Sequence, residues 1–234
     1  MNTMFENITI QLLEESHEES GGKLMCLPLS RSLLDAFERL GLAASPLVIR
    51  GVVFGKQEDP TIFRKVGFQQ LVTTAFNGPR ANGWMDLDVT DGGERKTVRL
   101  HYRTIGQPHD GEPGDKTLGN YDADGNWLGH LAVVADGVLI DPSIGQLNDE
   151  RYKICFDPPA LTAPASDVFL SGKEPLVFGM DGMLVGYFAY PDERTFESSR
   201  SWTNAEFRAQ LKAIGERTAA PFEGKESSDL HASE

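Results

Sequence analysis

Cysteine, basic residues and long apolar runs are all scarce in this chain of 234 residues. The two cysteines, Cys26 and Cys155, lie far apart, so we expect no disulfide framework and a reducing, cytoplasmic compartment. No apolar run approaches the roughly 20 residues that a membrane-spanning helix needs, and the acidic N-terminal segment does not resemble a secretory signal. Too few cysteines and histidines have ligand spacing for zinc, and no phosphate loop or dinucleotide motif occurs. We therefore expect no metal and no cofactor.

The shortage of basic residues decides which partners are expected. The chain has 22 lysines and arginines and 35 aspartates and glutamates, which gives a net charge of −13. Nucleic acids and anionic membranes are bound by basic patches, so neither is expected, whereas a protein or peptide substrate of basic character is favoured. The length predicts a single domain over residues 1–216 with a disordered acidic tail over 217–234. The oligomeric state does not follow from the sequence.

Residues 129–143 predict a β-hairpin that carries a histidine on one strand and an aspartate on the other. Asp136-Gly137 stands between two apolar runs, and this dipeptide is favoured in two-residue hairpin turns, where both residues need positive φ. Side chains alternate between faces along a strand, so His130 and Asp141 become diagonal neighbours on one face. Their Cα atoms should lie roughly 7–8 Å apart, which lets the imidazole and the carboxylate form a hydrogen bond. The alternative is a surface hairpin with a chance histidine.

A second segment places a cysteine at the start of a helix. Leu29, Leu33 and Phe37 recur at helical spacing, and Pro28 is compatible only with a first helical turn. Gly41 is the expected stop signal. Cys26 therefore begins this helix on its apolar face, where the helix dipole and a nearby imidazolium would favour the thiolate. The alternative is that Cys26 is a small buried apolar residue, as most free cysteines are.

The remaining pattern predicts further helices and strands around these two segments. We expect helices over residues 4–19 and from Thr203 to about Gly215, and strands over 46–55, 84–89, 96–105 and within 168–190. The last of these should turn at Asp181-Gly182. Residues 61–76 are ambiguous between helix and strand, and the polar stretch 106–126 is either a lid beside the hairpin or a solvated insertion.

The order of these segments resembles a known family. Gly21-Gly22-Lys-Leu-Met-Cys26 before a helix, then Trp127-Leu-Gly129-His130, then Leu-Ile-Asp141-Pro142-Ser143 is similar to the transglutaminase-like branch of the papain-like cysteine protease superfamily. The matching segments cover about 60 residues. The resemblance implies an α+β fold with an N-terminal nucleophile helix packed on an antiparallel sheet. It also implies a catalytic triad of Cys26, His130 and Asp141.

The sequence departs from that family at the oxyanion hole. Neither glutamine nor glycine immediately precedes Cys26, and no tryptophan follows it. The backbone N–H groups of Cys26 and Leu27 can supply part of the hole. The candidates for the remaining donor are the side chains of Gln11, Gln146 and Trp84.

Two function classes remain open at this stage. In the first, the chain is a thiol enzyme that acts on an amide or acyl bond through a thioester, with Cys26 as nucleophile, His130 as base and then acid, and Asp141 as the orienting group. Hydrolysis would make it a peptidase, amidase or deamidase, and capture by an amine a transglutaminase or other acyltransferase, arylamine acetyltransfer included. In the second, the domain is catalytically silent and binds a protein.

Overall fold

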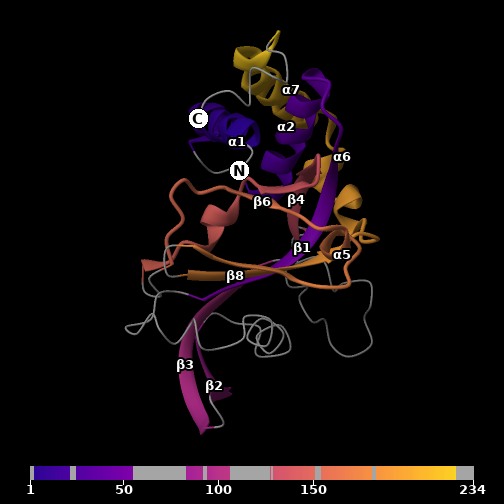
Figure 1. The fold of residues 1–234 in the computed structure, drawn as a ribbon. Helices are drawn as coiled ribbons and strands as arrows, with labels where there is room; N and C mark the ends of the chain where they lie inside the picture. The colour runs from indigo at the N-terminus through magenta and orange to yellow at the C-terminus, as the bar shows by residue number, and fades with distance from the viewer. Residues whose placement is uncertain are drawn as a thin grey trace.

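The computed structural model in Figure 1 describes residues 3–21, 25–54, 83–91, 94–105, 127, 129–150, 154–180 and 183–224. Helices and an antiparallel sheet that curls into a half-barrel form an α+β fold. The longer helices are α1 (Thr3–Ser20), α2 (Cys26–Arg39) and α7 (Ala205–Ala219). The short helical turns are η1 (Ile144–Leu147), α5 (Asp167–Leu170), η3 (Thr195–Ser198), α6 (Arg200–Thr203) and η4 (Ala220–Phe222). In the described part of the chain, no helix is long and apolar enough to cross a membrane.

Strand β1 (Ala44–Phe54) is the centre of the sheet because it pairs with three neighbours. Its first half pairs with β4 (His130–Ala135) and its second half with β3 (Glu94–Ile105), while β8 (Met183–Tyr190) pairs from Val48 to Phe54. The remaining strands extend the sheet outward from these four: β2 (Gly83–Asp91), β5 (Val138–Asp141), β6 (Leu161–Pro164) and β7 (Leu176–Met180). Figure 1 shows the β2–β3 hairpin reaching away from the end of the sheet where α1, α2 and α7 gather.

Two apolar layers lie on the two faces of this sheet. One face of the β4–β5 hairpin packs against α1, α2 and α7 through apolar residues that include Val133 and Ile140. The other face is buried as well, in a cluster that joins Ala132 and Leu139 to β1, β8 and the segment after β5. His130 and Asp141 belong to this second face, so they lie in the interior of the protein instead of on a surface hairpin.

Helix α2 begins and ends where the sequence predicts. Met25 is extended and precedes the helix, and the helix ends in a Schellman motif in which the N–H groups of Gly41 and Leu42 donate to the carbonyls of Glu38 and Phe37. Gly41 has a φ of 71°, the left-handed conformation that glycine adopts without strain. The Schellman motif therefore fixes the C-terminal end of α2, and Cys26 lies in its first turn.

The predicted helix 4–19 and the strands predicted over 46–55, 84–89 and 96–105 are confirmed as α1, β1, β2 and β3, with bounds that differ by a few residues. Three expectations fall outside the described residues: the structure of 61–76, the role of 106–126 and the turn at Asp181-Gly182. The region 168–190 begins with a helical turn, α5, before β7 and β8 form a hairpin. Asn204, one residue after the predicted helix start at Thr203, accepts the N–H of Phe207 at the start of α7.

The prediction of a disordered tail from residue 217 is wrong for its first residues. Helix α7 continues to Ala219, and both Thr218 and Ala219 are fully buried. The charged and small residues of this segment suggested disorder, but Arg217 reaches α1, where it pairs with Glu15 and Glu19. Residues 225–234 lie outside the described part of the chain.

Candidate active site

The hairpin that carries the candidate site has the predicted turn and register. Asp136 and Gly137 have φ values of 48° and 70°, so both adopt the left-handed conformation of a two-residue hairpin turn. Ala135 pairs with Val138, and the pairing continues along both strands to Val133 and Ile140. This register puts His130 and Asp141 on one face, as predicted.

His130 and Asp141 form a buried hydrogen-bonded pair. Nε2 of His130 lies 2.8 Å from Oδ2 of Asp141, and neither side chain is exposed to solvent. A carboxylate can only accept, so Nε2 carries the hydrogen and donates it. That arrangement leaves Nδ1 as the ring nitrogen available for proton transfer; Nδ1 is buried and has no hydrogen-bond partner among the described residues.

Three further donors hold the Asp141 carboxylate. The Tyr187 hydroxyl donates to Oδ2 at 2.7 Å, while the backbone N–H and the hydroxyl of Ser143 donate to Oδ1 at 3.0 and 3.1 Å. Burial raises the pKa of Asp141, but the His130 imidazolium and these donors outweigh it and hold that pKa below its usual value. Asp141 is therefore an ionised carboxylate inside the protein.

The same pair controls the charge of His130. Burial alone would lower its pKa, whereas the Asp141 carboxylate and, to a smaller extent, the Cys26 thiol raise the pKa of His130 to about 10. At neutral pH, the pair is therefore an imidazolium–carboxylate ion pair. In return, burial and the Asp141 charge raise the pKa of Tyr187 well above its usual value, so that its hydroxyl remains a donor.

Cys26 lies next to this pair, across the end of β4. Its side chain is 7 % exposed, and its thiol donates a weak hydrogen bond of 3.8 Å to the Gly129 carbonyl, the residue before His130. Ser30, one turn further along α2, donates to the Leu131 carbonyl at 2.8 Å. These two contacts join the first turns of α2 to the beginning of β4, and they keep the thiol beside the imidazole.

An aromatic cluster surrounds the thiol. Cys26 packs in a cluster with Trp127 and Phe196, whose rings make an edge-to-face contact at 6.0 Å. The Trp127 indole lies so close to Gly129 that a Cβ there would come within 2.0 Å of the ring. The indole N–H donates to the Thr195 hydroxyl at 2.9 Å. A glycine before His130 is thus required by the packing of Trp127.

Three residues of the site have no role predicted from the sequence: Tyr187, Ser143 and Gly51. The ring of Tyr187 crosses β1 over Gly51, and a Cβ on Gly51 would lie 2.7 Å from it. The Ser143 contact had a signal in the sequence: an aspartate commonly accepts the N–H two residues later in an Asx turn. The roles of Tyr187 and Gly51 depend on how β8 pairs with β1, for which no local signal exists.

The four candidate donors for the oxyanion hole lie in different elements of the structure. Leu27 follows Cys26 in the first turn of α2, where backbone N–H groups have no partner within the helix. Gln11 lies on α1, where its amide donates to Glu15 at 3.2 Å. Gln146 lies in η1, and its Nε2 is buried with no hydrogen-bond partner in the described part of the chain. Trp84 pairs with His101 in the β2–β3 hairpin through its backbone, and its side chain lies outside the description.

Nothing in the described ranges gathers three or more acidic, histidine or cysteine side chains in a way that could hold a metal ion. Comparisons with family models, curated proteins and solved structures find no match for this chain.

Proposed function

We propose that the chain is a cysteine-dependent hydrolase or acyltransferase of the transglutaminase-like, papain-like kind, acting on an amide or related acyl bond through a thioester. The observation that carries the proposal is the buried His130–Asp141 pair beside Cys26, with Nε2 bound to the carboxylate at 2.8 Å and Nδ1 left free. An imidazolium next to a cysteine stabilises the thiolate, which is the nucleophilic form. A buried ion pair placed only for stability would have no need of an adjacent thiol.

The proposed reaction has two steps. The Cys26 thiolate attacks the carbonyl carbon, and the backbone N–H groups of Cys26 and Leu27 stabilise the oxyanion that forms. As the carbon–nitrogen bond breaks, His130 gives its Nδ1 proton to the leaving amine, and a thioester remains. Water or a second amine then attacks the thioester, His130 takes up its proton, and the thiolate leaves. Asp141 keeps the imidazole in one orientation and stabilises its charge throughout.

One observation favours the silent alternative, in which the domain binds a protein without catalysis. Cys26 is almost completely buried, and its thiol makes a hydrogen bond with the Gly129 carbonyl that only the neutral form can donate. A domain that never uses a thiolate would keep the cysteine in this state. The two readings differ in the reactivity of the thiol.

Alkylation by iodoacetamide, read by mass spectrometry, distinguishes these readings. Cys155 is a free and exposed cysteine in the same chain, so it serves as an internal reference for a thiol outside the site. For an enzyme, Cys26 should react faster than Cys155 at pH 6 in spite of its burial. His130→Gln should abolish this excess, since the glutamine amide can still donate to Asp141 but cannot take a proton.

The result that contradicts the proposal is equally specific. If Cys26 reacts more slowly than Cys155 at every pH, and His130→Gln leaves both rates unchanged, the thiol is not activated. The domain is then a protein-binding domain without catalysis. If Cys26 is activated, incubation with simple amide and thioester donors should give a mass increase at Cys26 equal to the acyl group. A Cys26→Ser variant is the control for that adduct.

A further inference from the structure

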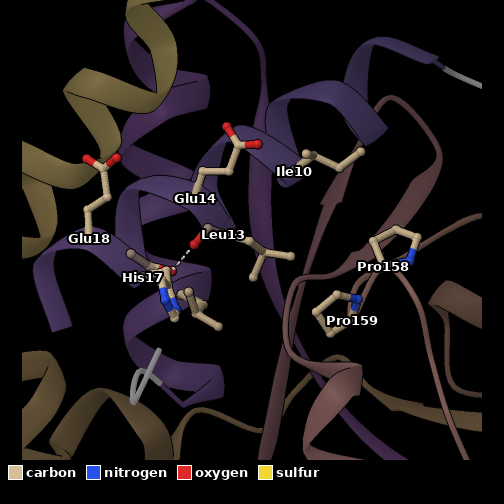
Figure 2. Close-up of a pocket in the computed structure, with 9 residues that line it drawn as sticks. Ile10, Leu13, Glu14, His17, Glu18, Pro158 and Pro159 are labelled. Atoms are coloured by element: carbon tan, nitrogen blue, oxygen red, sulfur yellow. Dashed lines mark hydrogen bonds between the residues drawn. The ribbon is translucent and has the colours of Figure 1, made fainter. Parts of the chain in front are cut away.

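A groove of about 550 Å³ lies outside the triad, between α1 and the turn that precedes β6. Figure 2 shows Ile10 and Leu13 of α1 on one side, with Pro158 and Pro159 facing them from the other. Leu29 of α2 contributes to the lining and is one turn from Cys26 along the same helix. The groove thus borders the helix that begins with the proposed nucleophile.

The floor of this groove is apolar and partly open to solvent. Ile10 is 36 % exposed, one of the few large apolar side chains in the described ranges that reach this level. It lies on the outer face of α1, opposite Phe5, Ile8 and Leu12, which are buried in the core. The volume is in the range of sites that bind a small molecule or a few side chains of a peptide. An apolar side chain from a partner would remove Ile10 and the two prolines from water.

The rim of the groove carries two glutamates of α1, Glu14 and Glu18, with His17 between them in the sequence. Helix α1 carries four glutamates in its last two turns. Glu15 and Glu19 face α7 and pair with Arg217 at 2.7 and 3.0 Å. Glu14 and Glu18 line the groove instead, and within the described structure neither forms an ion pair. The helix therefore pairs the carboxylates on one side and leaves the other two for something outside the described chain.

The charge of the whole chain restricts what the occupant can be. With a net charge of −13, a second copy would bring further negative charge to a rim that is already acidic. A basic segment is complementary both to this rim and to the chain as a whole. The occupant must also place an apolar group beside Ile10 and the prolines.

We propose that this α1 groove binds a basic peptide segment of a partner protein, with an aliphatic side chain on Ile10, Pro158 and Pro159 and flanking lysines or arginines at Glu14 and Glu18. Leu29 places the groove one turn of α2 away from Cys26. The proposal therefore includes that the segment is part of a protein substrate whose scissile or modified group reaches the thiol. That last assignment rests on the proposed function; the peptide binding does not.

Fluorescence anisotropy with a defined peptide tests the binding by itself. The probe is a fluorescein-labelled peptide with one leucine and three lysines spaced by glycine, titrated at low salt against the full chain. We expect Glu14→Gln combined with Glu18→Gln to weaken binding about tenfold, and Ile10→Ser to weaken it several-fold. A peptide with serine in place of leucine should bind as weakly to the native chain as the leucine peptide binds to Ile10→Ser.

A matched control separates the groove from the overall charge. Glu174→Gln combined with Glu206→Gln changes the net charge by the same amount at exposed positions away from the groove, and it should leave binding unchanged. The proposal is overturned if this control weakens binding as much as the groove variant does, if the groove variant binds normally, or if hexylamine binds as tightly as the peptide. Cys26→Ser should bind the peptide as tightly as the native chain does. Peptide binding therefore tests the groove even if the proposed thiol chemistry is wrong.

Discussion

The Tyr187 hydroxyl donates to the same oxygen of Asp141 that accepts from His130, at 2.7 and 2.8 Å respectively. Ser143 supplies two donors to the other oxygen, so the carboxylate has four donors and cannot rotate without losing some of them. A carboxylate fixed in this way fixes the imidazole that it holds. We therefore expect Tyr187 to act on the thiol through two intermediate side chains, as a positioning residue.

Tyr187→Phe should lower the alkylation rate of Cys26 at pH 6 about tenfold while keeping the fold. The ring still fills its place, but Asp141 loses one donor, and a hydrogen bond to a charged group contributes roughly 1.5–3 kcal/mol. Tyr190→Phe is the matched control, because Arg50 lies 4.3 Å from the centre of the Tyr190 ring and the Tyr190 hydroxyl is not among the described donors to Asp141. Equal rates in the two variants would show that Tyr187 has no positioning role.

Gly51→Ala should disturb the site without touching any triad residue. The added Cβ would lie 2.7 Å from the Tyr187 ring and 2.8 Å from Ile105 Cγ2, so the ring must move and the Asp141 contact is lost. Overpacking of this kind costs typically 1–3 kcal/mol of unfolding free energy. Urea denaturation and Cys26 alkylation should both report the change.

Gly179→Ala in β7 is the control for Gly51→Ala, because the nearest atom to its added Cβ is the Met183 carbonyl at an ordinary 3.7 Å. We expect that variant to keep native stability within about 0.5 kcal/mol. A Gly51→Ala protein as stable and as reactive as Gly179→Ala would mean that Tyr187 does not need the open space above Gly51.

The hairpin and the cysteine helix could be predicted because their signals are local. Asp136-Gly137 specifies a two-residue turn, and a two-residue turn determines which residues share a face. That register alone was enough to bring His130 and Asp141 together. In the same way, Pro28 and Gly41 mark both ends of α2, so the place of Cys26 in the first turn followed from its immediate neighbours.

The rest of the site depends on pairings between segments distant in the sequence. Tyr187 reaches Asp141 because β8 pairs with β1 in a register that puts Tyr187 opposite Gly51, and nothing near either residue indicates that register. The end of α7 was missed for a related reason. Arg217 and Thr218 resemble a polar tail in isolation, and only the contact with α1 and α2 makes them part of the folded structure.

The His130–Asp141 pair should make stability depend on pH. The pKa of His130 is raised from 6.5 to about 10 on folding, so its contribution is complete below pH 6.5 and is lost as the pH rises toward 10. In this window, the unfolding free energy should fall as the pH rises, by roughly 1 kcal/mol for each pH unit. The folded-state pKa of Asp141 is lowered, so its contribution is present above pH 3.8 and is lost in acid.

Asp141→Asn is the reference that isolates this effect from other titrating groups. Without the carboxylate, burial keeps the pKa of His130 from rising, and the dependence between pH 6.5 and 10 should disappear. Urea denaturation of both proteins across this range measures the difference in unfolding free energy, which should shrink as the pH increases. A difference that stays constant would mean that the imidazole is uncharged in the native protein.

The end of α7 should contribute to stability, and two truncated chains test this. A chain that stops at Glu216 loses three ion pairs, those of Arg217 with Glu15 and Glu19 and that of Glu223 with Arg39, together with the fully buried Thr218 and Ala219. The ion pairs are exposed and contribute little, so most of the loss comes from uncovering the apolar surface of α1 and α2. We expect a Tm about 5 °C below that of a chain ending at Gly224, at roughly 2–4 °C for each kcal/mol. Equal Tm values for the two chains would mean that residues 217–224 pack against α1 without adding to stability.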